Sequence, residues 1–351
     1  MPHSWQTRLP LTRAAVDRDA GRRMHPALFD ELLEDQATRL LPLWGGRALL
    51  QPATLGATTL GATTLDATTA DAAIPAGATP AGATPTAPAL ALLPTDAATS
   101  ALVRVYLGLT LEASVGEPAG TPVIAVVLTD AAAAELESAE SCWANLRSVA
   151  AGLSDRDAGL FTEALAITNW HAAHTHCPRC GTPTVVEQGG WLRRCLVDDN
   201  EVFPRTDPAV IAAVLDADGR LLLGSNAMWE NNRWSLLAGF VEAGESFESA
   251  VAREILEESG MRVVGPEYLA SQPWPFPASI MVGFRCRIAG SQDPAALRPD
   301  GEEILALRWF SREELWRERD ELLLPGSSSI AHAIVADWYG GPLDGPPGRP
   351  G

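Results

Sequence analysis

The stretch from Gly239 to Met261 constrains this chain more than any other, because it joins a glycine-bearing loop to a helix with a crowded acidic face. Ser246 has the side chain of a helix N-cap, and Gly260 is the residue type that most readily follows a helix in the left-handed conformation. The sequence therefore predicts a helix over Phe247–Ser259. The side chains expected to face the core are Ala250, Val251 and Ile255.

Three glutamates of this predicted helix, Glu254, Glu257 and Glu258, lie at positions i, i+3 and i+4 and therefore share one face. Carboxylates this close repel one another unless cations lie between them, and Mg²⁺ prefers such oxygen ligands. Arg253 is placed to pair with Glu257 or to reach Glu245 in the loop. An acidic helix face is usually only solvated. Here the two glycines, the arginine and the spacing occur together, which favours a metal site that receives a phosphate.

This stretch resembles the Nudix box, G-x5-E-x7-R-E-U-x-E-E-x-G-U with U aliphatic, at every fixed position. The resemblance implies a Nudix hydrolase, in which an α/β/α sandwich supports attack of water on phosphorus with two or more divalent ions, Mg²⁺ or Mn²⁺. Such ions polarise phosphoryl oxygens and lower the pKa of the attacking water. The Nudix box indicates the reaction but not the substrate.

A second motif, Ser271-Gln-Pro-Trp-Pro-Phe-Pro-Ala-Ser279, alternates prolines with two aromatic residues. The prolines predict a stiff extended strip that suits a flat heteroaromatic ring or a ribose. A proline-rich turn in the core or at a dimer contact is the alternative interpretation. The string closely resembles the array that follows the Nudix box in NADH pyrophosphatases. This resemblance implies that NADH or NAD⁺ is split into AMP and a nicotinamide mononucleotide, and that NAD caps are removed from RNA 5′ ends.

The resemblance also assigns roles to individual residues. The implied ligands of Mg²⁺ or Mn²⁺ are the Ala238 carbonyl, Glu254, Glu258 and Glu303, with Glu257 as an addition. Among the catalytic glutamates Glu254, Glu257 and Glu258, the last is expected to be the most sensitive to substitution. The implied substrate-binding residues are Phe203, Phe240, Gln272, Pro273, Trp274, Pro275, Phe276, Pro277, Ala278, Ser279 and Ala331. Phe240 falls where the family stacks an aromatic ring on adenine, although both phenylalanines outside the strip could equally be core residues.

Cys177-Pro-Arg-Cys180 followed by Cys195 resembles a zinc ribbon, since such a knuckle presents two thiolates to one tetrahedral ion. The family has a fourth cysteine shortly after the third, and this chain has Asp198 and Asp199 in that region. The fourth ligand of Zn²⁺ is then Asp198, Asp199 or a nearby histidine, His174 or His176. The alternative is a ribbon that has lost its metal. Cys142 and Cys286 are interpreted as buried apolar residues.

The chain is expected to have an α+β fold. The predicted parts are an N-terminal α/β domain (1–172) with a flexible low-complexity insertion at about 52–88, a zinc-ribbon-like segment (173–206), a Nudix domain (207–339) and a disordered tail (340–351). Helices are predicted over Ala131–Gly152 and Asp155–His174, and strands over Ala209–Leu215, Arg220–Leu223 and Trp234–Ala238. No leader-like or membrane-spanning run is found, so a cytoplasmic protein is expected. The family resemblance implies a homodimer.

The net charge of −18 and the absence of lysine argue against a protein that grips nucleic acid by broad phosphate neutralisation. Two alternatives to an NAD(H) pyrophosphatase remain open. One is a Nudix hydrolase that prefers ADP-ribose or dinucleoside polyphosphates, because these share the same box. The other is a nucleotide- or RNA-binding module with a vestigial catalytic site, which the cysteine cluster alone supports.

Overall fold

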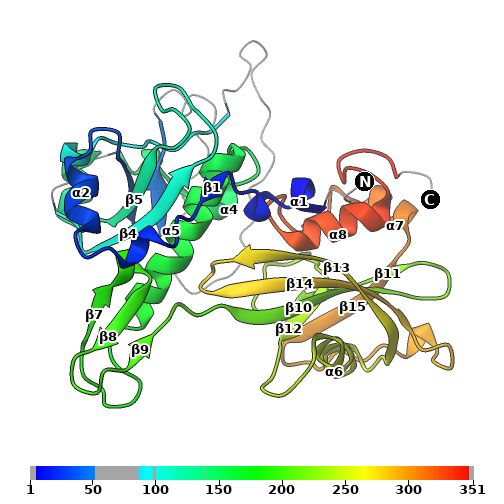
Figure 1. Cartoon of the computed structure of the whole chain (residues 1–351). Helices are drawn as coiled ribbons and strands as arrows, with labels where there is room; N and C mark the ends of the chain where they lie inside the picture. Colours follow the sequence, from blue (N-terminus) through cyan, green and yellow to red (C-terminus); the bar gives the residue numbers. More distant parts are fainter. Residues whose placement is uncertain (1–4, 52–86, 98–99, 138, 348–351) are drawn as a thin grey trace, which may run out of the picture.

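The computed structural model describes residues 5–51, 87–97, 100–137 and 139–347 (Figure 1). The predicted insertion at 52–88 lies almost entirely outside the described residues, as do the last four residues of the predicted tail. The described part of that tail contacts the C-terminal domain. The Tyr339 hydroxyl donates to the Gly345 carbonyl over 2.9 Å, and Leu343 packs against the core.

The N-terminal domain is built on a six-stranded sheet in the order β1-β4-β5-β2-β3-β6. Its strands are β1 (Val16–Asp17), β2 (Arg39–Trp44), β3 (Arg47–Leu49), β4 (Val103–Thr110), β5 (Pro122–Val127) and β6 (Trp143–Asn145). The helices are α1 (Trp5–Arg8), α2 (Leu28–Glu34), α3 (Asp130–Leu136), α4 (Leu146–Val149) and α5 (Asp155–Ala173). The long helix α5 packs on the sheet, and Ser154 caps it by accepting from the Asp157 backbone N–H.

The prediction of one helix over Ala131–Gly152 is wrong, whereas the helix predicted over Asp155–His174 is confirmed as α5. Helix α3 ends at Leu136, and the chain returns as β6, whose buried Trp143 pairs with Leu49 of β3. Asn145 then caps the short α4 through its side-chain oxygen. Pairing with a sheet edge and burial of an indole have overridden the helical propensity of the alanine-rich run.

The cysteine-bearing segment forms a three-stranded sheet of β7 (Thr184–Glu187), β8 (Leu192–Cys195) and β9 (Glu201–Val202). It lies against the end of α5 in the N-terminal domain (Figure 1). The indole N–H of Trp191 donates to the Tyr106 carbonyl, and the guanidinium of Arg193 donates to Thr184 and contacts His171. The contacts with Tyr106 and His171 fix the ribbon to the N-terminal domain.

The C-terminal domain is a mixed sheet between helices. The order of strands across the sheet is β13 (Val263–Trp274), β14 (Ser279–Ile288), β10 (Asp207–Leu215), β11 (Leu221–Asn226) and β15 (Ile304–Phe310). A further strand, β12 (Leu237–Phe240), pairs with β10. Helix α6 (Phe247–Ser259) covers one face, and α8 (Ile330–Tyr339) with α7 (Arg312–Glu318) lies on the other side of the sheet (Figure 1). The expected α+β fold with an α/β/α sandwich is therefore confirmed.

Alternate residues of the parallel pair β10–β14 supply two separate cores. Val210 and Val282 pack beneath α6 with Ile255, while Ile211 packs with Ile334 of α8. The strand predicted over Trp234–Ala238 begins later than expected, at Leu237. In the described part of the chain, no helix is both long and apolar enough to cross a membrane.

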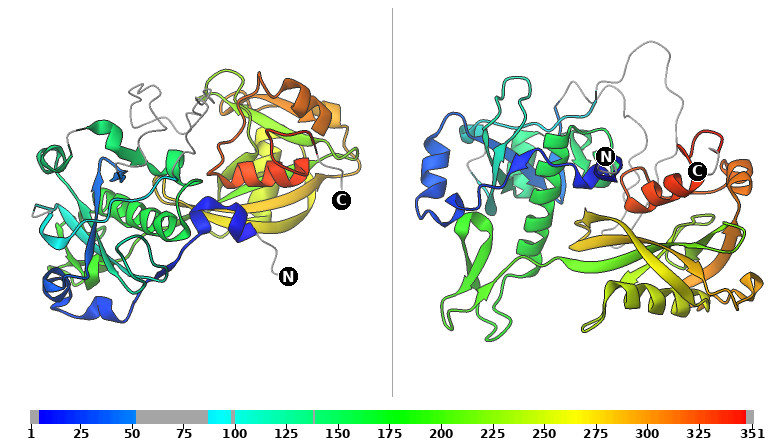
Figure 2. Two further views of the ribbon diagram at one scale, coloured as in Figure 1. Left: turned by 90° about the horizontal axis from the view of Figure 1, so that it is seen from above. Right: turned by 45° about the vertical axis from the view of Figure 1, so that its right-hand side comes forward.

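The N-terminal segment links the two lobes of the molecule (Figure 2). Leu9 is buried in the core under α8, and the guanidinium of Arg8 pairs with the Asp337 carboxylate over 2.6 Å. The first residues of the N-terminal domain therefore pack against the C-terminal domain and tie the two lobes together.

Candidate active site and zinc-ribbon cluster

Helix α6 begins and ends where the sequence predicts. The Ser246 hydroxyl accepts from the backbone N–H of Ser249, and Gly260 has a φ of 71° at the other end. Ala250, Val251 and Ile255 are buried. This packing fixes the rotation of the helix, so that Glu258 lies at the edge of the buried face and Glu257 lies toward solvent.

Arg253 holds the loop and the helix together. Its guanidinium contacts both oxygens of Glu245 at 2.9 Å, Glu254 at 2.8 Å and Glu257 at 3.1 Å. It also donates to the Phe240 carbonyl over 2.9 Å. These carboxylates raise the pKa of Arg253 above its usual value, with Glu245 as the main cause. Both pairings expected from the sequence therefore occur at once, and one cation orients two candidate metal ligands.

Gly239 is required by a close approach. A methyl group at its α-carbon would overlap the carboxylate of Glu254. The first glycine of the motif thus has a direct structural reason, because it lets a candidate ligand lie against the backbone of β12. The neighbouring residue Ala238, whose carbonyl is the proposed backbone ligand, precedes it on the same strand.

Glu258 is the most buried of the acidic residues at this site, with 4% of its surface exposed. Burial raises its pKa to about 8, and the negative charges of Glu254, Glu303 and Asp300 add to the shift. Its Oε2 atom is buried without a hydrogen-bond partner among the described residues. A buried carboxylate with an unpartnered oxygen and acidic neighbours is a group that a divalent cation would stabilise.

The sites of Glu254 and Glu257 differ from that of Glu258. Burial raises the pKa of Glu254, and contact with Arg253 opposes that shift. The side chain of Glu257 is 61% exposed and retains its contact with Arg253. The structure therefore distributes the three glutamates from the interior to the surface. This difference in burial would let the three carboxylates bind more than one ion along one face of the helix.

A cavity of about 150 Å³ brings residues from both sequence motifs together. Glu258, Glu303 and Ala238 contribute its acidic side, and Trp274 and Ala331 contribute to its apolar side. Glu303 arrives on a loop whose backbone N–H groups at 302, 303 and 304 all donate to Asp300. Met281, Asn226 and Trp229 also line the cavity.

The proline-rich strip is a hairpin turn and not the extended strip predicted from its prolines. Residues 271–274 end β13, residues 275–278 form a turn, and Ser279 begins β14. Pro275 and Pro277 lack the N–H that would continue the ladder, so the strands must part there. Their carbonyls accept from the side-chain amide of Asn169 on α5, over 2.9 and 3.2 Å.

The hairpin divides the candidate substrate residues between two sides. Trp274 lines the cavity that contains Glu258, whereas Pro273, Pro275, Ala278 and Ser279 line a second cavity. Gln272 is fully buried; its amide nitrogen donates to the Ser328 carbonyl, and its oxygen has no partner among the described residues. Among the strip residues, then, Trp274 has the most direct access to the carboxylates.

Phe203 and Phe240 are both exposed, with 57% and 60% of their surfaces accessible. The alternative that they are core aromatics is therefore wrong for both. Phe240 ends β12 directly after Gly239, so its ring lies next to the glutamate-bearing loop. Phe203 follows β9 and leads into the C-terminal domain. Both rings are available to stack on a ligand.

Arg147 was missed by sequence reasoning. Its guanidinium lies 5.1 Å from the ring of Trp274 and 4.1 Å from that of Phe276. Its carbonyl accepts a hydrogen bond from the Ser328 hydroxyl. Arg147 and Asn169 reach the hairpin from a distant part of the chain, so no local pattern signals them. The N-terminal domain thus helps to position the strip.

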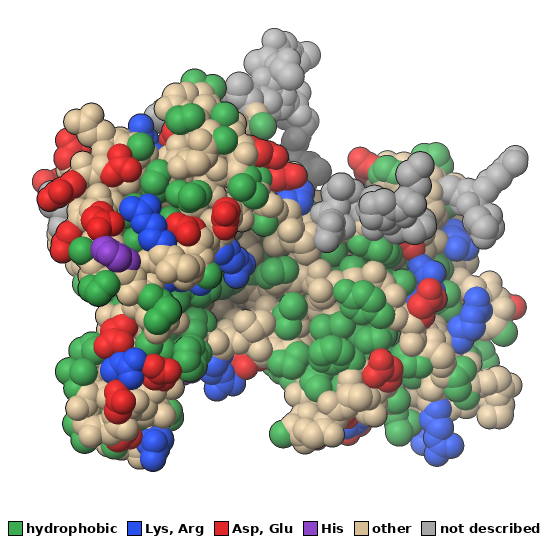
Figure 3. Space-filling view, viewed as in Figure 1, with side chains coloured by type: hydrophobic (Ala, Val, Ile, Leu, Met, Phe, Trp, Pro, Cys, Tyr) green, Lys and Arg blue, Asp and Glu red, His purple; other side chains and the backbone are tan. Residues whose placement is uncertain are grey.

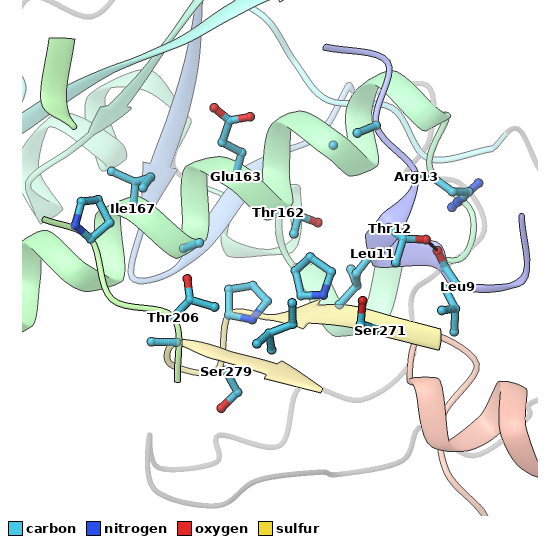
Figure 4. Close-up of a pocket in the computed structure, with 18 of the residues that line it drawn as sticks. Leu9, Leu11, Thr12, Arg13, Thr162, Glu163, Ile167, Thr206, Ser271 and Ser279 are labelled. Carbon is cyan, nitrogen blue, oxygen red and sulfur yellow. Dashed lines mark hydrogen bonds between the residues drawn. The ribbon is translucent and has the colours of Figure 1, made fainter. Parts of the chain in front are cut away.

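The second cavity, of about 720 Å³, lies where the two lobes meet, and the surface is hollowed there (Figure 3). Thr162, Glu163 and Ile167 of α5 line it together with the N-terminal segment and the hairpin residues Ser271 and Ser279 (Figure 4). None of the candidate metal ligands Glu254, Glu257, Glu258 and Glu303 lines this cavity. It is larger than the acidic cavity but lacks the group of carboxylates that could hold divalent ions.

The cysteine cluster is compact. Ligand atoms of Cys177, Cys180, Cys195 and Asp198 all lie within 4.8 Å of one another. Among the described residues this is the one such group with three or more members. Cys142 and Cys286 are buried apart from it, as predicted. The carboxylates of α6 do not form such a group, and two of them, Glu254 and Glu257, contact Arg253.

Comparisons with known proteins agree with this arrangement. The NUDIX domain family matches residues 205–330, the NADH pyrophosphatase-like rudimentary NUDIX domain matches 37–170, and the NADH pyrophosphatase zinc ribbon domain matches 172–203. The chain is 39% identical over 282 residues to the NAD-capped RNA hydrolase NudC of Mycobacterium bovis, covering 72% of this chain and 86% of that protein.

More distant similarity extends to a human protein and to a solved structure. The human NAD-capped RNA hydrolase NUDT12 is 36% identical over 200 residues, covering 53% of this chain and 42% of that protein. A crystal structure of a NUDIX hydrolase from Nitrosomonas europaea is 23% identical, covers 48% of this chain and 94% of that one, and has a TM-score of 0.38.

Proposed function

This chain belongs to the Nudix hydrolase family, within its NADH pyrophosphatase branch, and from that premise we propose that it hydrolyses the diphosphate of NADH or NAD⁺. The products are AMP and a nicotinamide mononucleotide. One observation carries the proposal: Glu258, Glu303 and Ala238 of the metal-binding set share a cavity with Trp274 of the substrate strip. A diphosphate held by the acidic side would leave an attached ring beside the indole.

The donor set fits divalent ions. Glu254, Glu257, Glu258, Glu303 and the Ala238 carbonyl would hold Mg²⁺ or Mn²⁺, and the unpartnered Oε2 of buried Glu258 supports this assignment. When bound, the ions neutralise phosphoryl oxygens and make water a better nucleophile. The attacking water forms a new P–O bond while the bridging P–O bond breaks, and the departing phosphate takes the proton.

The remaining residues position these groups. Arg253 orients Glu254 and Glu257 and ties them to the loop through Glu245. Trp274 and Ala331 form an apolar surface that suits a nicotinamide ring, and Phe240 is exposed where an adenine can stack. The Ser328 carbonyl fixes the buried side chain of Gln272, which belongs to the strip.

Removal of NAD caps from RNA 5′ ends is a second activity of the same site. The named activity of the relatives favours it, since both the mycobacterial and the human protein are NAD-capped RNA hydrolases. The chemistry is unchanged, because the same diphosphate is cleaved and the adenosine stays on the RNA. The complete set of carboxylates favours an enzyme over a binding module with a vestigial site.

The decisive assay is product analysis on a substrate panel. Purified protein with Mg²⁺ or Mn²⁺ is given NADH, NAD⁺, NAD-capped RNA, ADP-ribose and a dinucleoside polyphosphate. We expect AMP and a nicotinamide mononucleotide from NADH, with the highest kcat/KM on an NAD-type substrate. A clear preference for ADP-ribose or the dinucleoside polyphosphate would refute the proposed substrate while keeping the reaction.

Zinc in the ribbon and a homodimer complete the proposal. The three clustered cysteines support a zinc ion, and the family resemblance suggests two copies. Light scattering of the purified chain tests the second point, because a mass of one chain at micromolar concentration would contradict it.

A further inference from the structure

The ribbon presents three thiolates where a closed structural zinc site needs four ligands, and a carboxylate lies at the remaining corner. We infer that Asp198 is the fourth ligand, so that this chain holds zinc through three sulfurs and one oxygen. The inference concerns the chain's own departure from a four-cysteine ribbon, and it is independent of the substrate proposed above.

The separations between the ligand atoms are close to those of a tetrahedral site, with the two sulfurs of Cys180 and Cys195 slightly nearer than a zinc ion would hold them. The Sγ atoms of Cys180 and Cys195 are 3.4 Å apart, and the Sγ of Cys177 lies 3.5 and 3.6 Å from the two oxygens of Asp198. With Zn–S near 2.3 Å and Zn–O near 2.0–2.2 Å, the edges of a regular tetrahedron are about 3.5–3.8 Å. The printed separations lie close to this range, and all four ligand atoms lie within 4.8 Å of one another, which is compact enough for one ion to draw them together.

The backbone fixes this arrangement without help from an ion. In the first knuckle, the Gly181 N–H donates to the Cys177 carbonyl and the Cys177 N–H donates to the Thr182 carbonyl. Cys195 is brought opposite by its register with Thr184 in the β7–β8 hairpin. After β8, the Asn200 N–H donates to Oδ1 of Asp198 over 3.0 Å, which holds the carboxylate toward the cysteines.

The other residues that could serve as the fourth ligand are directed elsewhere. Asp199 is 85% exposed and pairs with Arg194 over 2.8 Å. The ring of His174 contacts the Trp170 carbonyl and stacks on Trp170. His176 contacts the Thr175 hydroxyl through Nδ1. None of these three belongs to the compact group of ligand atoms.

The surroundings suit a bound, negatively charged site. The side-chain amide of Asn200 donates to the Sγ of Cys177 over 3.7 Å, and Cys180 contacts the Thr182 hydroxyl over 3.3 Å. Three thiolates, one carboxylate and Zn²⁺ carry a net charge of −2, the same as four thiolates with Zn²⁺. Arg179 lies 4.0 Å from Asp198. Replacement of a thiolate by a carboxylate therefore preserves the charge and changes only the softness of one ligand.

The test uses the full chain, reduced and metal-free, and three variants. Asp198→Asn keeps an oxygen that can accept from Asn200 but loses the ligand charge. Asp199→Asn is the matched control, one residue away on the same loop. Asp198→Cys restores four thiolates. Zinc affinity is measured by competition with a chelator, and Co²⁺ is used as a spectroscopic probe of the number of bound thiolates.

We expect one zinc ion per chain in the wild type and in Asp199→Asn. Asp198→Asn should bind zinc at least about tenfold more weakly, since even residues outside the ligand set cost tenfold or more when removed. The thiolate-to-Co²⁺ charge-transfer band of Asp198→Cys should exceed that of the wild type in the ratio of four thiolates to three. The contacts of Trp191 and Arg193 with protein groups leave the ribbon anchored in every variant.

Three results would overturn the inference: a reduced wild type that takes up no zinc, equal zinc affinities for Asp198→Asn and the wild type, or equal Co²⁺ bands for Asp198→Cys and the wild type. Circular dichroism of the metal-free proteins separates loss of a ligand from loss of the fold. Hydrolysis of NADH is measured in parallel with Mg²⁺, so a failure of the zinc site and a failure of the proposed function are distinguished.

Discussion

Each lobe carries a buried glutamate on a helix that packs against its sheet, Glu163 on α5 and Glu258 on α6. Burial is the main cause of a raised pKa in both, to about 7 for Glu163 and about 8 for Glu258. The charged neighbours of Glu163 are positive, whereas those of Glu258 are negative. Arg18 and Arg23 lower the pKa of Glu163, whereas Glu254, Glu303 and Asp300 raise that of Glu258.

The difference shows that burial alone does not make a catalytic carboxylate. Glu163 is compensated by arginines of its own chain, with Arg18 3.4 Å away. Glu258 has acidic neighbours, and its compensation must come from a cation that the chain does not supply. Under the proposed function, the C-terminal lobe would use its buried acid to hold a divalent ion, whereas the buried acid of the N-terminal lobe already faces two arginines.

The largest effect expected is on turnover by Glu258→Gln. Loss of a metal-binding charge at the reacting phosphate should lower kcat by about a thousandfold, comparable to the loss of a strong electrostatic group in other active sites. Glu163→Gln is the matched control, because it makes the same change on the other helix and should leave kcat within about twofold. Steady-state hydrolysis of NADH with Mg²⁺ measures both. Similar losses in the two variants would remove the distinction between the lobes.

The sequence predicts helix α6 well, but it predicts the neighbouring proline strip and the contacts between distant segments poorly. The ends of α6 follow from Ser246 and Gly260, which act locally, and its buried face follows from the spacing of three apolar residues. The shape of the proline strip did not follow, because the parting of two strands depends on a partner strand that the motif does not contain. Arg147 and the choice of Asp198 over Asp199 depend on contacts made by tertiary folding, so the sequence could only leave them open or miss them.

The second prediction concerns the pH dependence of stability set by Glu163. Its folded-state pKa of about 7 lies above the ordinary value of 4.5, so the folded chain binds this proton more tightly than the unfolded chain. The free energy of unfolding contributed by this group is therefore full below about pH 4.5 and falls as the pH rises through 7. The pKa difference corresponds to at most roughly 3 kcal/mol.

Urea unfolding of the wild type and Glu163→Gln between pH 5 and 8 isolates this contribution, since all other groups are shared. We expect the wild type to lose stability relative to the variant as the pH rises across this range. Parallel curves for the two proteins would mean that the arginines fully offset the burial, and the two glutamates would then differ in pKa as well as in their neighbours.

The third prediction compares the glycines that allow close approach in each lobe. A methyl group at Gly239 would displace the Glu254 carboxylate, whereas one at Gly159 of α5 would come within 2.9 Å of the Ala14 backbone. Gly239→Ala should lower kcat about tenfold, because small misplacements of reacting groups are costly. Gly159→Ala should lower the free energy of unfolding by about 1–3 kcal/mol through overpacking and leave kcat unchanged. A fall in kcat for both variants would show that the lobes are coupled through their packing.

The smallest effect is expected from Arg18→Ala, which asks whether burial or charge dominates at Glu163. Arg18 is 61% exposed, so water screens its pairing with Glu163 and the change in stability near neutral pH should stay below about 1 kcal/mol. Removal of this cation should raise the pKa of Glu163 further, and the loss of stability should extend to higher pH. Arg205→Ala is the control. Like Arg18, Arg205 lines the cavity between the lobes and is 60% exposed, but it pairs with Asp207. The contrary outcome is that Arg18→Ala removes the pH dependence of the free energy of unfolding as completely as Glu163→Gln does. In that case the ion pair with Arg18, and not burial, would be what distinguishes Glu163 of α5 from Glu258 of α6.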